Sequence, residues 1–378
     1  MRRPPEGGGS PAAADLARIA RHDWFYVGGD YVAEPDGTYL RGQMYVERFT
    51  PADRRHALPV VMIHGGAQTA TNFVATADGR PGWLHDFLRA GYEVLLVDQP
   101  ERGRSGHALP AGAPAPFFRY SAERIEAMFT APERARLWPQ AERHDQWPGS
   151  GVRGDPAFER FFASQVEQLA DRDEIERLSR DGGVALLDAI GPSILLTHSQ
   201  SGPIGWTITD ARPGLVKAIL AVEPNGPPFR DVKFLGPPDG GAPDWFDFEE
   251  GDARRWGLTR LPMTFDPPAE TPADLAPVPL PPPAPDLAPG LQPSGSRRRL
   301  VNLAGVPILI LTGEASYHAP YDHCTSAFLD WAGVPHEFVR LQDRGLPGNG
   351  HMMMLERNSR EIAELMIGWL AERLYDAD

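Results

Sequence analysis

The chain has 378 residues, which suits one large domain with insertions or two to three smaller domains. Its formal net charge of −14 argues against nucleic acid or an anionic membrane surface as a partner. A hydrophobic share of 42% with 23% charged residues is ordinary for a globular protein. No apolar run approaches the ~20 residues that a membrane span needs.

The N-terminus begins Met-Arg-Arg-Pro-Pro and is not followed by the apolar stretch of a secretory signal peptide. We expect residues 1–21 to form a flexible tail before a domain at 22–378. Cys324 is the only cysteine, so an intrachain disulfide is impossible. That composition fits a reducing compartment, and we expect a cytoplasmic protein, with export as the alternative.

Strands and helices alternate along most of the chain. Segments at 23–33 and 39–48 flank a Pro-Asp-Gly turn and predict a hairpin. Short apolar runs predict strands at 60–63, 94–97, 194–196, 218–222, 308–311 and 337–341. Helices are expected at 81–90, after the third of these strands to about 210, at 321–332 and at 357–374. This order predicts an α/β fold whose mostly parallel sheet carries helices on both faces.

Two insertions interrupt the alternation, at about 110–180 and 224–300. The first has a partly helical pattern and several phenylalanines. The second contains a proline-dense section at 262–293, where helix is excluded and extended polyproline geometry is favoured. A disordered linker is one interpretation of it. We favour a cap over the site, because a free linker would not follow a stretch so rich in tryptophan and phenylalanine.

Residues 194–202, Ile-Leu-Leu-Thr-His-Ser-Gln-Ser-Gly, join a predicted buried strand to a helix. Small residues lie two places before and two places after Ser199, which is the spacing of a nucleophile elbow. Small flanks are needed because the turn is strained and the neighbouring backbone passes close by. The usual flanks are glycines, whereas this chain has Thr197 and Ser201.

The segment His64-Gly65-Gly66-Ala67 follows directly after the strand predicted at 60–63. Glycines at this place let backbone N–H groups point into a pocket. We expect the N–H groups of Gly66 and Gln200 to stabilise a developing oxyanion. Gly65 is expected to line the same pocket.

His351 ends a Gly-Asn-Gly-His loop and is the only histidine after the last predicted strand. A histidine on such a loop can act as a general base, so activity should rise as His351 loses its proton, around the ordinary pKa of about 6.5.

The base needs an acid to orient it. Ser316 stands where most enzymes of this architecture place that acid, and Glu314 comes too early. Glu223 follows the strand at 218–222, at the edge of the sheet where site residues gather. We expect Glu223 to be the acid, with Glu314 and Asp322 as lesser candidates.

His318, Asp322, His323 and Cys324 form a cluster that raises the question of a metal. His318 and His323 are five residues apart and would not share a helix face, so we expect no metal. Tyr317 and His318 follow a strand end and are expected to line the pocket.

Together the elbow, the His-Gly-Gly loop, the Val-Glu-Pro segment around Glu223 and the loop of His351 resemble the α/β-hydrolase superfamily, over roughly residues 22–375. Within it the chain is similar to a group of bacterial serine esterases whose triad acid is a glutamate after the sixth strand. The resemblance implies an eight-stranded sheet, hydrolysis of a carboxylic ester through an acyl-enzyme, and no cofactor.

Other functions are compatible with the same residues. An acyltransferase, or a lyase or C–C hydrolase, could use the same triad, and a non-catalytic receptor could use the same scaffold. The aromatic insertions predict an apolar or aromatic ester as the small-molecule partner. We expect neither nucleic acid nor a membrane span, and a homodimer is left open.

Overall fold

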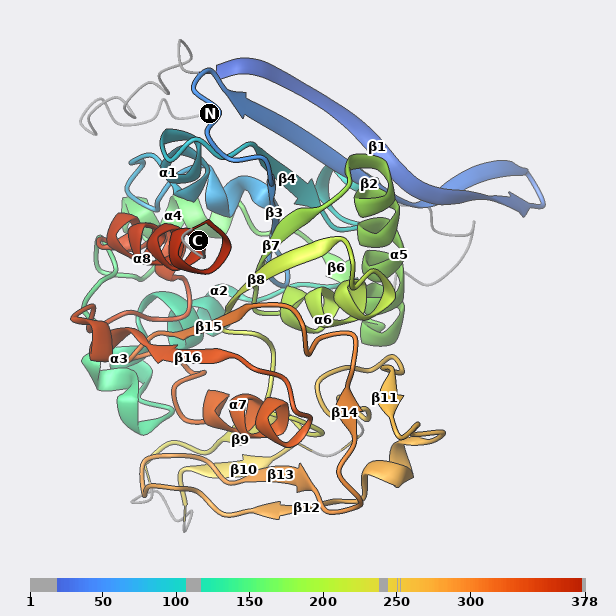
Figure 1. Ribbon diagram of the computed structural model, residues 1–378. Coiled ribbons are helices and arrows are strands. Elements are labelled where there is room, and N and C mark those ends of the chain that lie inside the picture. Colours follow the sequence, from blue (N-terminus) through green and yellow to red (C-terminus); the bar gives the residue numbers. More distant parts are fainter. Residues whose placement is uncertain (1–18, 107–116, 238–243, 250, 252, 376–378) are drawn as a thin grey trace.

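The computed structural model describes residues 19–106, 117–237, 244–249, 251 and 253–375. Its centre is an eight-stranded sheet with the order β1-β2-β4-β3-β7-β8-β15-β16 (Figure 1). The strands are β1 (Ile19–Glu34), β2 (Gly37–Pro51), β3 (Val60–Ile63), β4 (Val94–Asp98), β7 (Ser193–His198), β8 (Val216–Val222), β15 (Ile308–Thr312) and β16 (Glu337–Arg340). The six from β4 to β16 run parallel to one another, whereas β2 runs antiparallel to both of its neighbours, β1 and β4. The predicted α/β-hydrolase fold with its mostly parallel sheet is confirmed.

The hairpin of β1 and β2 is longer than predicted and extends beyond the body of the molecule (Figure 1). Its turn lies at the predicted place, with Glu34 paired to Gly37. Residues 19–21 of the expected tail belong to β1, and residues 1–18 lie outside the described residues.

Helices cover both faces of the sheet (Figure 1). On one face α1 (Trp83–Arg89) lies against α8 (Ser359–Leu374), and on the other α5 (Arg172–Ile190) lies against α6 (Ser201–Ala211). Val60 and Met62 of β3 face the first pair, and Val61 and Ile63 face the second. Because central strands such as β3, β4 and β15 are buried on both sides, their sequences are almost entirely apolar.

The first insertion lies between β4 and α5. It contains α2 (Ala122–Ile125), η4 (Glu126–Thr130), α3 (Pro132–Ala135), η5 (Pro139–Arg143) and α4 (Pro156–Ala163). A short pair, β5 (Phe117–Phe118) and β6 (Gln168–Leu169), closes it. The predicted insertion extended to about residue 180, but its residues from 172 onward belong to α5, which covers the sheet.

The second insertion forms three two-stranded sheets. They are β9 (Val232–Phe234) with β10 (Phe246–Phe248), β11 (Phe265–Asp266) with β14 (Arg299–Leu300), and β12 (Pro277–Leu280) with β13 (Gly290–Pro293). The proline-dense section contains no α-helix, as predicted. It contributes β11, β12 and β13 and a 3₁₀ turn η7 (Pro272–Leu275), and its other residues form loops. It packs on α7 (Asp322–Trp331), where a Cβ on Gly290 would lie 2.5 Å from Sγ of Cys324 (Figure 1).

No helix within the described ranges combines the length and the apolar character that a membrane crossing requires.

Candidate active site

Ser199 lies at the turn between β7 and α6. Its φ of 54° falls in the left-handed region that residues with a side chain rarely adopt. Its N–H donates to the carbonyl of Val222 at 3.1 Å, and its own carbonyl accepts from the N–H groups of Gly202 and Asn225, both at 2.9 Å. Hydrogen bonds on both sides therefore hold the strained turn that was predicted as an elbow.

The two unusual flanks of the elbow have specific partners. Ser201 Oγ donates to the Ile63 carbonyl at 2.7 Å and accepts the His198 N–H at 2.8 Å, which ties the elbow to β3. Thr197 faces Gly205 of α6, where a Cβ would lie 2.8 Å from Cγ2 of Thr197. A glycine in the helix thus provides the room that a glycine in the strand usually provides.

The His-Gly-Gly loop passes directly beside the serine. A Cβ on Gly65 would lie 3.2 Å from Cβ of Ser199, and one on Gly66 would lie 3.7 Å from Cδ of Gln200. Among the described residues no acceptor takes the backbone N–H of Gly66 or of Gln200. Both N–H groups can therefore donate to a ligand oxygen beside Ser199.

His351 and Glu223 form a buried pair, with Nδ1 of the imidazole 2.5 Å from Oε2 of the carboxyl group. Glu223 also accepts from Ser316 Oγ at 2.6 Å and from the Gly313 N–H at 2.7 Å. Burial raises the pKa of Glu223 well above its ordinary value and nearby Asp322 adds to this, while the two hydrogen bonds oppose it. Ser316, in the place usual for the acid, thus donates a hydrogen bond to the carboxyl group of Glu223.

Burial lowers the pKa of His351 well below its ordinary value, and His198 and His318 lower it further. The His318 ring stacks on His351 with centroids 4.9 Å apart. Nε2 of His198 lies 3.1 Å from the His351 carbonyl oxygen. The imidazole of His351 is therefore neutral at pH 7 and able to accept a proton.

Tyr317 lies between the serine and the histidine. Its hydroxyl lies 3.3 Å from Nε2 of His351, and burial raises its pKa well above the ordinary value while the nearby Ser199 side chain opposes that rise. Because Nδ1–H of His351 faces Glu223, Nε2 is the acceptor and the tyrosine donates to it. The sequence predicted Tyr317 only as a residue that lines the pocket. The one feature of the sequence that pointed to Tyr317 was its position just after Ser316.

The lesser candidates for the acid have other partners. Glu314 accepts the Gly348 N–H at 3.0 Å and lies 3.5 Å from Arg143. Asp322 lies 2.9 Å from Nδ1 of His318. His318 is fully buried behind His351 and does not line the pocket as expected.

Within the described ranges, the one group that could hold a metal is Glu223, His318 and His351, whose ligand atoms lie within 4.8 Å of one another. The hydrogen bond between Glu223 and His351 and the His318–Asp322 pair account for this closeness.

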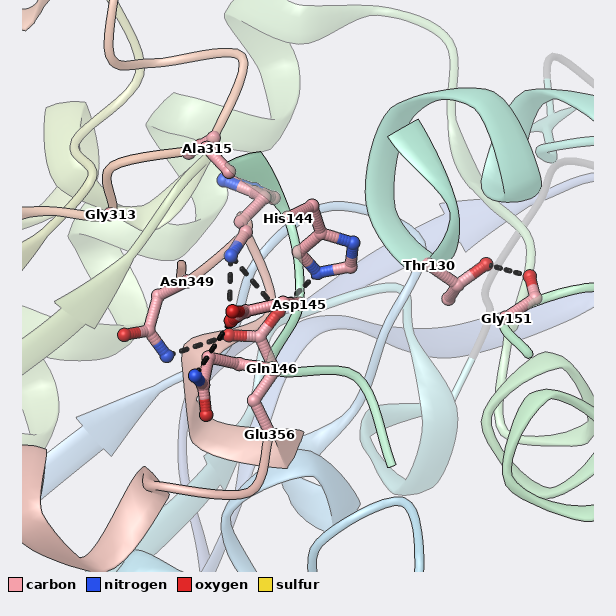
Figure 2. Close-up of polar contacts among 12 residues, drawn as sticks. Thr130, His144, Asp145, Gln146, Gly151, Gly313, Ala315, Asn349 and Glu356 are labelled. Carbon is pink, nitrogen blue, oxygen red and sulfur yellow. Dashed lines mark hydrogen bonds and ion pairs between the residues drawn. The ribbon is translucent and has the colours of Figure 1, made fainter. Parts of the chain in front are cut away.

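Glu356 anchors the loop that carries His351 (Figure 2). Its carboxylate accepts the Gly350 N–H at 3.0 Å and Nδ2 of Asn349 at 2.8 Å, and Nε2 of His144 lies 2.8 Å from Oε1. A Cβ on Gly350 would lie 2.9 Å from Nε2 of His144, so this position requires glycine. A histidine of the first insertion thus contacts the carboxylate that holds the loop of His351.

The same loop is joined to the segment that supports Glu223. The Asn349 carbonyl accepts the Ala315 N–H at 2.8 Å, and a Cβ on Gly313 would lie 2.7 Å from that carbonyl oxygen. The loop that carries His351 and the loop that donates to Glu223 are therefore in direct backbone contact.

A cavity of about 340 Å³ lies over Ser199. Gly66 and Gln200 contribute to its floor, and the first insertion contributes the side chains of Phe118, Tyr120, Met128 and Leu137. The second insertion contributes residues between 225 and 260, and none from its proline-dense section.

No family model matches the chain. A curated fungal protein, the probable secreted lipase phiG of Fungal sp. (strain ATCC 74256), is 41% identical over 357 residues, which cover 93% of this chain and 89% of that protein. The solved structure of a novel bacterial esterase has a TM-score of 0.63 at 22% identity, covering 94% of this chain and 96% of that one. At that identity the structural likeness shows the fold alone.

The expectation of a cytoplasmic protein is contradicted by the fungal relative, which is named as secreted. The expectation drew on the single cysteine, Cys324, and on the absence of an apolar leader. A chain with one cysteine forms no intrachain disulfide in any compartment, so this composition does not distinguish between them.

We expect the contact between His144 and Glu356 to make stability depend on pH. Burial lowers the pKa of His144, but hydrogen bonds to Glu133 and Glu356 outweigh burial and raise the pKa to about 9. This stabilisation is fully present below the unfolded pKa of about 6.5 and is lost as pH rises through 9. His144→Gln should therefore reduce the free energy of unfolding more at pH 6 than at pH 10, by on the order of 2 kcal/mol.

Urea denaturation of both proteins at the two pH values measures this difference. His85→Gln, at a half-buried histidine of α1 whose pKa is lowered by burial and by Arg89, is the control and should show no larger loss at pH 6 than at pH 10. An equal loss for His144→Gln at pH 6 and pH 10 would contradict the prediction.

Proposed function

We propose a catalytic triad for this chain, which belongs to the α/β-hydrolase superfamily and is a carboxylic-ester hydrolase. The proposed triad consists of Ser199, His351 and Glu223. The observation that carries the proposal is the 2.5 Å contact between His351 and Glu223, beside a serine held at φ 54°. Strained backbone and buried titratable pairs gather at active sites.

In the proposed mechanism Ser199 Oγ attacks the acyl carbonyl of the ester while Nε2 of His351 takes its proton. For this transfer the Ser199 hydroxyl must first replace the Tyr317 hydroxyl as the hydrogen-bond donor at that nitrogen. The protonated imidazole gives its proton to the leaving alcohol, which leaves an acyl-serine. Water activated by the same histidine releases the acid.

The N–H groups of Gly66 and Gln200 are proposed to bind the oxyanion of the tetrahedral intermediate. Neither has an acceptor among the described residues, and both border Ser199. Donors already in place are worth about 3 kcal/mol each in such sites, because no reorganisation is needed when charge develops.

The two insertions are proposed to act as a cap on a single domain at 22–378. Their side chains make up most of the lining of the cavity over Ser199. Among the described residues of the insertions, those that line the cavity lie between 118 and 176 and between 225 and 260. The proline-dense section lies outside the lining and packs on α7 through β13.

Ser199→Ala should lower kcat/KM for a 4-nitrophenyl ester by at least about 10³-fold, because the nucleophile is lost. The fold should persist, and a fluorophosphonate probe should label the wild type but not this variant. Ser164→Ala, at a half-buried serine outside the cavity, serves as the control and should be labelled normally. Substantial turnover by Ser199→Ala would refute the assignment.

Glu223→Gln should lower kcat by about 10³-fold, since an amide facing Nδ1 favours the wrong tautomer of His351. Glu314→Gln, a matched change in the neighbouring loop, should cost less than about tenfold because Glu314 contacts Gly348 and Arg143 instead. The kcat values of the two purified variants are measured by steady-state kinetics. A larger loss in Glu314→Gln than in Glu223→Gln would identify Glu314 as the acid instead.

The acid limb of the pH profile of kcat/KM should have its midpoint below pH 6.5. Its cause is the lowered pKa of His351, which stays neutral as pH falls toward that value. Because His351 and Glu223 interact strongly, the midpoint belongs to the pair. The profile is measured with a neutral ester, circular dichroism verifies folding at each pH, and a midpoint at or above 6.5 would speak against this environment.

A further inference from the structure

The cavity over Ser199 is cationic, although the protein as a whole carries a net charge of −14. Its lining has more cations than carboxylates, and the cations are Arg124, Arg172, Lys233, Arg254 and Arg260. A concave site lined by one sign of charge attracts ligands of the other sign.

The buried carboxylates of the lining are already engaged. Asp231 lies 2.9 Å from Nη1 of Arg172 and 2.7 Å from Nη2 of Arg254, so one acid serves two guanidinium groups. Glu176 accepts two backbone N–H groups of the second insertion at 2.9 Å each. The exposed Glu249 is the third carboxylate of the lining, and Arg260 also lies 3.3 Å from Asp173, so the five lining cations face three lining carboxylates and one neighbouring carboxylate.

Two further cations of the lining are exposed. They are Arg124 of α2 and Lys233 of β9, one from each insertion. Within the described residues neither forms an ion pair with an acidic side chain, although Asp247 is the cross-strand neighbour of Lys233. Burial raises the pKa of Tyr120, a lining residue, whereas Arg124, Arg172 and Arg102 lower it, so three guanidinium groups act on one phenol of the wall.

Arg102 adds positive charge behind the oxyanion loop. It is 1% exposed, and its two terminal nitrogens donate to the Gly65 carbonyl and to Oε1 of Gln200, both at 3.0 Å. Both acceptors are neutral, so its charge is not cancelled by an ion pair. Burial lowers the pKa of Arg102 to about 9, which leaves it charged at pH 7.

We propose that the cavity takes an ester bearing a carboxylate in addition to its scissile bond, with Arg124 and Lys233 receiving that carboxylate. Aromatic side chains such as Tyr120 and Phe234 pack on the carbon chain between the two groups. This substrate class rests on the proposed function of Ser199 and refines the apolar ester expected from composition.

The test compares mono-4-nitrophenyl glutarate with neutral 4-nitrophenyl hexanoate, and 4-acetoxybenzoate with phenyl acetate. The first pair places the carboxylate on the acyl side and the second on the alcohol side. For at least one pair we expect a kcat/KM about tenfold higher for the anionic ester, falling toward parity as NaCl is raised.

Arg124→Gln should lower kcat/KM for the preferred anionic ester by about tenfold, mainly through KM, and change the neutral ester less than about twofold. Arg119→Gln is the matched control, because Arg119 lies five residues earlier, is exposed and does not line the cavity.

The proposal is overturned if neither anionic ester is preferred over its neutral partner, or if Arg124→Gln affects both members of a pair equally. Hexanoate turnover and fluorophosphonate labelling of Ser199 separate this failure from a failure of the triad. Both persist if only the substrate class is wrong.

Discussion

The site depends on keeping a fully buried carboxyl group, that of Glu223, supplied with hydrogen-bond donors. A carboxylate without donors would be costly in that position. Its donors come from Ser316, from the Gly313 N–H and from His351, which lie after β15 and before α8. The requirement brings the end of β8, the loop after β15 and the base loop together at one edge of the sheet.

Two residues with side chains adopt left-handed backbone there, Ser199 at φ 54° and Glu223 at φ 45°. They end the adjacent parallel strands β7 and β8, and the Ser199 N–H donates to the carbonyl of Val222 next to Glu223. Such conformations persist only where surrounding contacts over-determine them. The central sheet, apolar on both faces, provides that rigid surrounding.

Local sequence patterns predicted the elements that depend on local physics. The apolar run before Ser199 and the Gly-rich loop before His351 marked the strand end and the loop without knowledge of the fold. The role of Tyr317 and the contact of His144 with Glu356 could not be predicted, since the latter joins residues 212 positions apart. The positive charge of the cavity could not be predicted either, because its cations come from segments that lie far apart in the sequence.

The contact between His144 and Glu356 has a consequence for anyone who would engineer this enzyme. Excising the first insertion to obtain a minimal catalytic core would also remove the cation that faces a buried carboxylate next to the base loop. A truncated design would have to replace Glu356 at the same time, or graft an equivalent donor in place of His144. The insertion is therefore not an interchangeable module.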